Sequence, residues 1–177
     1  MGDVFKEQIV KRRTTFKDTA IRISLVLSVI LIFVATVLVL FLQGIGIIIT
    51  AAATFGAMYL MSFLSVEYEY VYTNGELDID AIYNKSRRKR LFSAVVKDFE
   101  IMAHIDDKNH EHTLTTAQEV KDFSSGLPGP DTYVFLTIIN GKKTKVIIEP
   151  NEKMLKAISG GISRRKLFLR PGVILIG

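Results

Sequence analysis

The longest uncharged stretch of this chain limits what it can fold into. From Ile23 to Val66 the sequence contains no Asp, Glu, Lys, Arg or His, and Gln43-Gly44-Ile45-Gly46 interrupts it near the middle. A helix rises about 1.5 Å per residue and a bilayer core is about 30 Å thick, so each crossing needs roughly 20 apolar residues. The sequence therefore predicts a transmembrane hairpin over residues 20–64, with helices at 20–42 and 45–64.

Charge on either side of this hairpin predicts its orientation. The connection Gln43–Gly46 is uncharged, whereas five of the six residues Lys85–Arg90 are basic. Six basic residues precede the uncharged stretch: Lys6, Lys11, Arg12, Arg13, Lys17 and Arg22. Basic loops stay in the cytoplasm. We expect a multi-pass protein of the plasma membrane with both termini cytoplasmic.

Composition excludes several functions. The chain of 177 residues has a formal charge of +5 and no cysteine, which excludes disulfides and thiolate chemistry. On a membrane protein a basic balance favours anionic lipids as partners over nucleic acid, which we do not expect to bind. Ionisable residues at membrane depth mark transport paths, and residues 23–66 have none.

Small residues in the second helix predict a packing face. Small side chains allow helices to approach closely in a bilayer. This face can pack on the first helix of the same chain, on a second copy in a homo-oligomer, or on another membrane protein. The candidate packing residues are Gly46, Thr50, Ala52, Ala53 and Gly56.

Residues 1–19 form a basic head before the hairpin. Phe5 and Ile9 are four residues apart among basic residues. Two interpretations remain open: a short interfacial helix, or a frayed basic tail that only sets topology.

Two Asn-Gly pairs organise residues 65–161 as a cytoplasmic β domain. Asn74-Gly75 and Asn140-Gly141 each join strand-like runs, which is typical of two-residue hairpin turns. The first hairpin has tyrosines and aliphatic residues on one face and acidic residues on the other. In this register Glu69 lies opposite Asp80, so we expect a cation, a basic side chain or a bulge beside them.

The same register brings residues 84–90 back towards the end of the second helix. We therefore interpret them as a basic turn at the bilayer surface, with the alternative of a solvated turn that serves topology and solubility. The candidate residues facing lipid or phosphate are Lys85, Arg87, Arg88, Lys89 and Arg90.

Further strands are expected at residues 91–95, 97–104 and 119–123, followed by a hairpin of residues 132–139 and 142–149. A helix is expected over Asn151–Ser159, with Gly160-Gly161 as its C-terminal cap. Residues 162–177 form a basic and apolar tail.

Catalytic motifs are missing from the sequence. His110 and His112 are weak candidates for metal ligands, but no other ligand cluster supports them. We expect no metal, no cofactor and no enzymatic activity.

The β domain resembles the bacterial pleckstrin-homology-like domain through Tyr70–Leu77, the basic turn, the strand running into Pro150 and the terminal helix. The whole chain also resembles small two-helix membrane proteins of unknown function from Firmicutes, through Glu7–Arg12, Thr73–Asp80 and Ile148–Leu155. The resemblance implies an α+β fold: a bent antiparallel sheet of about seven strands closed by one C-terminal helix. It also implies binding of proteins or lipids rather than catalysis.

The leading hypothesis is a membrane-tethered, non-catalytic binding or scaffold module. The alternative is an accessory subunit of a membrane complex or a homo-oligomer that packs through the second helix. A third hypothesis, from another class, is an enzyme with its site in the loop His104–Asp131.

Overall fold

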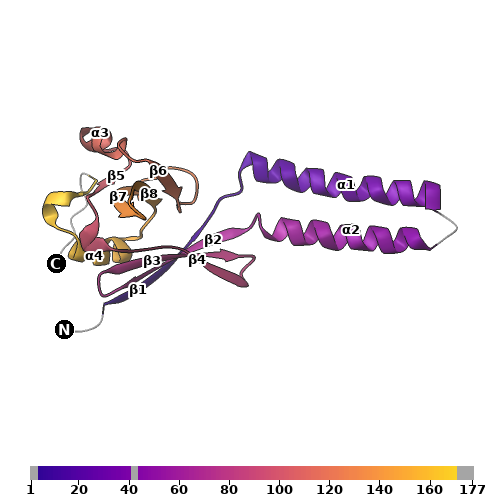
Figure 1. Cartoon of the computed structure of the whole chain (residues 1–177), viewed down its shortest axis with the longest axis horizontal. Coiled ribbons are helices and arrows are strands. Elements are labelled where there is room, and N and C mark those ends of the chain that lie inside the picture. Colours follow the sequence, from indigo (N-terminus) through magenta and orange to yellow (C-terminus); the bar gives the residue numbers. More distant parts are fainter. Residues whose placement is uncertain (1–3, 41–43, 171–177) are drawn as a thin grey trace. The chain divides into compact units, whose positions relative to one another are not determined.

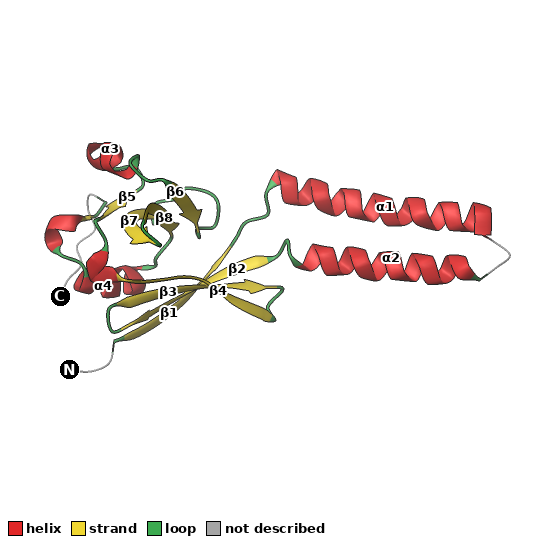
Figure 2. Ribbon diagram, in the orientation of Figure 1, coloured by secondary structure: helices red, strands yellow, loops and turns green. Residues whose placement is uncertain are grey.

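The computed structural model describes residues 4–40 and 44–170. These residues form two compact units. Of the described residues, a helical unit contains 14–40, 44–66 and 83–86, and a β unit contains 4–13, 67–82 and 87–170. Figures 1 and 2 show the helices and strands of each unit.

The helical unit is an antiparallel pair of helices, α1 (Phe16–Leu40) and α2 (Ile45–Ser62). Both are long and apolar enough to cross a membrane, and most of their apolar side chains are exposed. Helix α1 begins four residues before the predicted start at residue 20, because the Thr15 backbone N–H donates to Asp18 Oδ2 at 2.9 Å. This contact is one of the two hydrogen bonds of a capping box, a motif found at helix starts. The predicted end at residue 42 lies outside the described residues.

The first sheet of the β unit has the order β1-β2-β3-β4. Its strands are β1 (Phe5–Lys11), β2 (Val66–Thr73), β3 (Glu76–Tyr83) and β4 (Arg87–Val95). Both interpretations of the basic head are wrong for residues 5–11, because these residues pair antiparallel with β2, from Phe5 opposite Thr73 to Lys11 opposite Glu67.

The second sheet has the order β6-β8-β7-β5-β9, with β6 parallel to β8 and β9 parallel to β5. Its strands are β5 (Ile101–His104), β6 (Glu119–Asp122), β7 (Tyr133–Ile139), β8 (Lys142–Ile148) and β9 (Leu167–Phe168). The described residues thus confirm an α+β fold, with the seven strands β2–β8 inside residues 65–161. Strands β1 and β9 come from the segments that the sequence analysis had assigned to the head and the tail.

Both Asn-Gly hairpins are confirmed. Asn74 and Gly75 have φ of 48° and 96°, and Asn140 and Gly141 have φ of 50° and 78°. Two consecutive residues with positive φ are the requirement of a type I′ turn, whose twist matches that of the strands.

The larger of two hydrophobic clusters lies between the two sheets and helix α4 (Glu152–Gly161). Phe99 and Phe135 stack at its centre, with ring centroids 4.0 Å apart. The predicted apolar face of the first hairpin is confirmed by the buried side chains of Tyr70, Tyr72, Leu77, Ile79 and Ala81.

Helix α4 does not end at a glycine cap as predicted. It begins at Asn151, whose side chain accepts from the Met154 N–H at 2.8 Å, and it continues through Gly160 and Gly161. Neither glycine has the positive φ of a left-handed cap. A Cβ atom at Gly161 would lie 2.9 Å from Tyr72 Oη and 3.3 Å from Val96 Cγ1, so close packing is what requires this glycine.

The two glycines are expected to respond oppositely to alanine. Gly161→Ala should lower the free energy of unfolding by about 1–2 kcal/mol, because the new methyl group overpacks the site. Gly160→Ala meets nothing within 4 Å and should raise it by up to about 1 kcal/mol through helix propensity. Urea unfolding of the full chain in detergent micelles measures both, and equal responses would contradict the packing explanation.

Candidate functional site

The basic run Lys85–Arg90 is mostly strand. Only residues 84–86 form the turn, in which Asn84 and Lys85 have φ of 48° and 57°, and β4 begins at Arg87. The predicted seven-residue turn is therefore wrong, because the basic side chains find acidic partners on the neighbouring strands.

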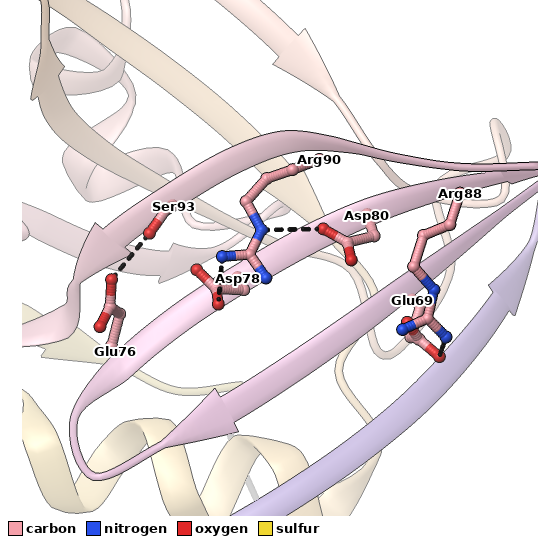
Figure 3. Close-up of polar contacts among 7 residues, drawn as sticks. All are labelled: Glu69, Glu76, Asp78, Asp80, Arg88, Arg90 and Ser93. Carbon is pink, nitrogen blue, oxygen red and sulfur yellow. Dashed lines mark hydrogen bonds and ion pairs between the residues drawn. The ribbon is translucent and has the colours of Figure 1, made fainter.

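Two of the arginines contact carboxylates on the face of the first sheet that lies opposite the core (Figure 3). Arg88 pairs with Glu69 of β2 at 2.7 Å. Arg90 reaches Asp78 at 3.0 Å and Asp80 at 3.1 Å, both on β3. These are the basic side chains expected beside Glu69 and Asp80, so Arg88 and Arg90 are engaged within the sheet.

Strand β4 changes faces along its length. Ser93 Oγ donates to Glu76 Oε1 at 2.8 Å on the acidic face (Figure 3), as Arg90 does to Asp80, whereas Phe92 is buried in the core. In a regular strand, residues two apart, such as Arg90 and Phe92, lie on the same face. Here they lie on opposite faces, so the alternation of side chains shifts by one residue between them, as at a β-bulge.

Glu69 is the most perturbed carboxyl group of this face. It is only 2% exposed, and its Oε2 atom has no hydrogen-bond partner among the described residues. Burial raises the pKa of Glu69; Arg88 acts in the opposite direction, and the nearby carboxyls of Glu7 and Asp80 raise the pKa further. Arg88 is therefore the cation that offsets the electrostatic cost of burying the Glu69 carboxylate.

The remaining basic candidates differ in their surroundings. Lys85 and Lys89 form no ion pair within residues 4–40 and 44–170, whereas Arg87 has an interaction of its own. The turn that carries Lys85 belongs to the helical unit. Its Asn84 N–H donates to Ser65 O at 3.0 Å, which fixes the turn at the end of α2.

Aromatic rings strengthen this junction. The Phe63 and Tyr83 rings meet edge to face, with centroids 6.2 Å apart. The Phe63 ring also meets the Tyr59 ring of α2 edge to face, with centroids 5.0 Å apart. Edge-to-face pairs contribute about 0.5–1.5 kcal/mol beyond the burial of their area. The β3–β4 turn and the end of α2 are therefore one structural element.

Comparison with known protein families identifies the family of this chain. The model of the family described as Bacterial PH-like domain (DUF6106) matches residues 2–169. The chain belongs to this family. Among curated proteins and solved structures, nothing matches it at significant similarity.

The PH-like family match includes α1 and α2 as well as both sheets. The matched range therefore includes the helical pair, and the resemblance to the bacterial pleckstrin-homology-like domain is confirmed. PH-like domains are generally non-catalytic modules, in agreement with a binding role.

The small residues of α2 divide between two faces. A Cβ at Gly46 would lie 3.0 Å from Thr36 Cβ, and Thr50 Oγ1 is 3.2 Å from Thr36 Oγ1, so these residues face α1. Ala53 is half-buried, whereas Ala52 and Gly56 are exposed. Packing of that second face on another copy or another membrane protein stays a prediction.

The histidines are engaged in local structure. His110 Nδ1 lies 2.9 Å from Asp107 Oδ2, and its ring stacks on Phe168 with centroids 3.6 Å apart. His112 lies on α3 (Glu111–Leu114). Among the described residues no three metal-binding side chains come together, so the structure gives no support to a metal site at His110 and His112.

Sequence reasoning missed the residue that joins β1 to the second sheet. Gln8 Nε2 donates to Glu149 O at 2.7 Å, and Gln8 Oε1 accepts from the Asn151 N–H at 2.7 Å. Both partners lie between β8 and α4. A signal was present in the sequence, because Gln8 and Glu149 belong to two of the three motifs that carried the resemblance of the whole chain.

Proposed function

We propose that this protein is a membrane-tethered, non-catalytic binding module whose β unit lies at the cytoplasmic face of the plasma membrane. The observation that carries the proposal is the pairing of β1 with β2. These strands precede and follow the two apolar helices in the chain, and Lys11 lies opposite Glu67. A chain that leaves and re-enters one sheet at paired residues must cross a membrane an even number of times.

Charge supports the cytoplasmic side. Lys11, Arg12 and Arg13 lead into α1, and Lys85 to Arg90 follow α2. Basic segments of this kind are retained in the cytoplasm. Since Lys85 and Lys89 have no carboxylate partner in the described chain, they are the residues we assign to anionic headgroups, each worth about 1 kcal/mol near such a surface.

The orientation can be tested with single cysteines because the natural chain has none. Ile45→Cys marks the start of α2, and Lys142→Cys marks the β7–β8 hairpin. A membrane-impermeant maleimide should label residue 142 only in inverted vesicles and residue 45 only in spheroplasts. Labelling of both residues from one side would contradict the proposal.

The lipid assignment needs its own test. Lys85→Gln/Lys89→Gln should reduce the phosphatidylglycerol that the purified full chain retains, as measured by native mass spectrometry. Lys142→Gln/Lys145→Gln removes the same charge from β8 and should leave retention unchanged. Equal losses in the two variants would show that only net charge matters.

A further inference from the structure

Three lysines line one groove between β1 and α4. Lys6 comes from β1, while Lys153 and Lys156 lie three residues apart on α4. The groove has a volume of about 670 Å³, within the range of about 300–1,000 Å³ that is typical of small-molecule sites. Strand β1 and helix α4 are in contact, so the groove is formed within the β unit.

The charges in this groove are uncompensated. None of the three lysines forms an ion pair in the described chain, and none of the residues that line the groove is acidic. Arg88 and Arg90 differ in this respect, because each contacts a carboxylate. Like charges that face one space repel one another and raise the local potential, which attracts an anion.

Tyr72 adds a hydrogen-bond donor to the groove. It lies opposite Lys6 in the β1–β2 register and lines the same groove. Its side chain is only 5% exposed, yet its hydroxyl has no hydrogen-bond partner among the described residues. The hydroxyl is not one of the fully buried unpaired atoms, so it keeps contact with solvent and can donate to an acceptor in the cationic groove.

The chemistry of Tyr72 fits this role. Burial raises the pKa of its hydroxyl, so the group stays protonated and can donate a hydrogen bond. Gly161 leaves room for this hydroxyl, since a Cβ there would lie 2.9 Å from it.

We propose that this groove binds a phosphate monoester, with the ammonium groups of Lys6, Lys153 and Lys156 and the Tyr72 hydroxyl on the phosphate oxygens. Val4 and Ala157 supply apolar surface beside the cations, which fits a phosphate carried on an apolar body. Lysine ammonium groups are common phosphate ligands, and three of them match a dianion better than a carboxylate. The site is separate from Lys85 and Lys89 and does not depend on the proposed function.

Calorimetry of the full chain in phosphatidylcholine nanodiscs tests the proposal with three probes: inorganic phosphate, phenyl phosphate and dihexanoyl phosphatidic acid. Phenyl phosphate should bind more tightly than inorganic phosphate because its ring covers the apolar surface. Lys153→Gln/Lys156→Gln should weaken binding at least about tenfold, and Tyr72→Phe about tenfold, since a hydrogen bond to a charged group contributes about 1.5–3 kcal/mol.

Matched variants keep the test specific. Lys142→Gln/Lys145→Gln changes the net charge equally on β8 and should leave the affinity within about twofold. Phosphatidic acid binding at least about tenfold more tightly than phenyl phosphate would assign the ester to a lipid, and similar affinities would assign it to a soluble molecule. No saturable binding of any probe up to about 10 mM, or an equal loss in the β8 variant, would overturn the proposal.

Discussion

Tyr70→Phe is expected to lower the free energy of unfolding of the β unit by about 2–4 kcal/mol, as two buried backbone groups lose their partner. Tyr70 has no exposed surface. Its hydroxyl donates to Phe123 O at 2.7 Å and accepts from the Glu149 N–H at 3.2 Å. It thereby joins β2 to the ends of β6 and β8. Urea unfolding of the full chain in detergent micelles, followed by near-ultraviolet circular dichroism, measures the loss.

Tyr72→Phe is the matched control, two residues along the same strand. The Tyr72 hydroxyl has no partner in the described part of the chain, so its removal should change stability by less than about 0.5 kcal/mol. If both variants lost the same stability, the cause would be a general effect of removing a hydroxyl from this core and not the bridge made by Tyr70.

Local chemistry explains what could be predicted from the sequence. An Asn-Gly pair specifies positive φ at two consecutive residues, so both hairpins follow from a few residues each. The tyrosines of β2 alternate with glutamates, and period-two alternation assigns the buried face without knowledge of the partner strand. An uncharged run of sufficient length identifies both apolar helices in the same way.

Long-range pairing explains what was missed. Residues 5–11 contain basic, acidic and apolar side chains without clear alternation, and their partner strand begins beyond the helices at Val66. The Gln8 contacts with residues 149 and 151 span still more of the chain. The groove of Lys6, Lys153 and Lys156 arises only from this pairing, so no local pattern could have revealed it.

The basic run was misassigned for an electrostatic reason. Consecutive Lys and Arg residues predict a solvated turn when they are considered alone. Glu69 opposite Asp80 already required a cation nearby, and Arg88 and Arg90 supply it. A basic segment next to an uncompensated acidic face gains charge pairing when it forms a strand.

Arg88→Met provides the second large expected effect, and it should depend on pH. The variant should lose about 1–2 kcal/mol at neutral pH, less than the value for a fully buried pair because Arg88 is 59% exposed. Glu69 would then be a buried carboxylate near Glu7 and Asp80 without its cation. Arg88 lowers the pKa of Glu69, so its loss raises the folded-state pKa further above the ordinary value.

The sign of the pH dependence follows from this direction. A carboxyl whose pKa is raised by folding binds its proton more tightly in the folded state. The penalty is therefore fully present above the folded-state pKa and disappears as the pH falls towards the ordinary carboxyl value of about 4.3. Thermal unfolding of the full chain between pH 4 and pH 8 should show wild type and Arg88→Met converging at the acidic end.

Two further variants separate this effect from lost packing. Lys89→Met removes a neighbouring charge that has no ion-pair partner in the described chain, and it should show no pH-dependent loss. In a Glu69→Gln background, Arg88→Met should cost little at any pH, because no buried carboxylate remains to be compensated. A loss that stayed constant from pH 4 to pH 8, or that persisted with Gln at position 69, would mean that Arg88 acts through its aliphatic stem and not through its charge.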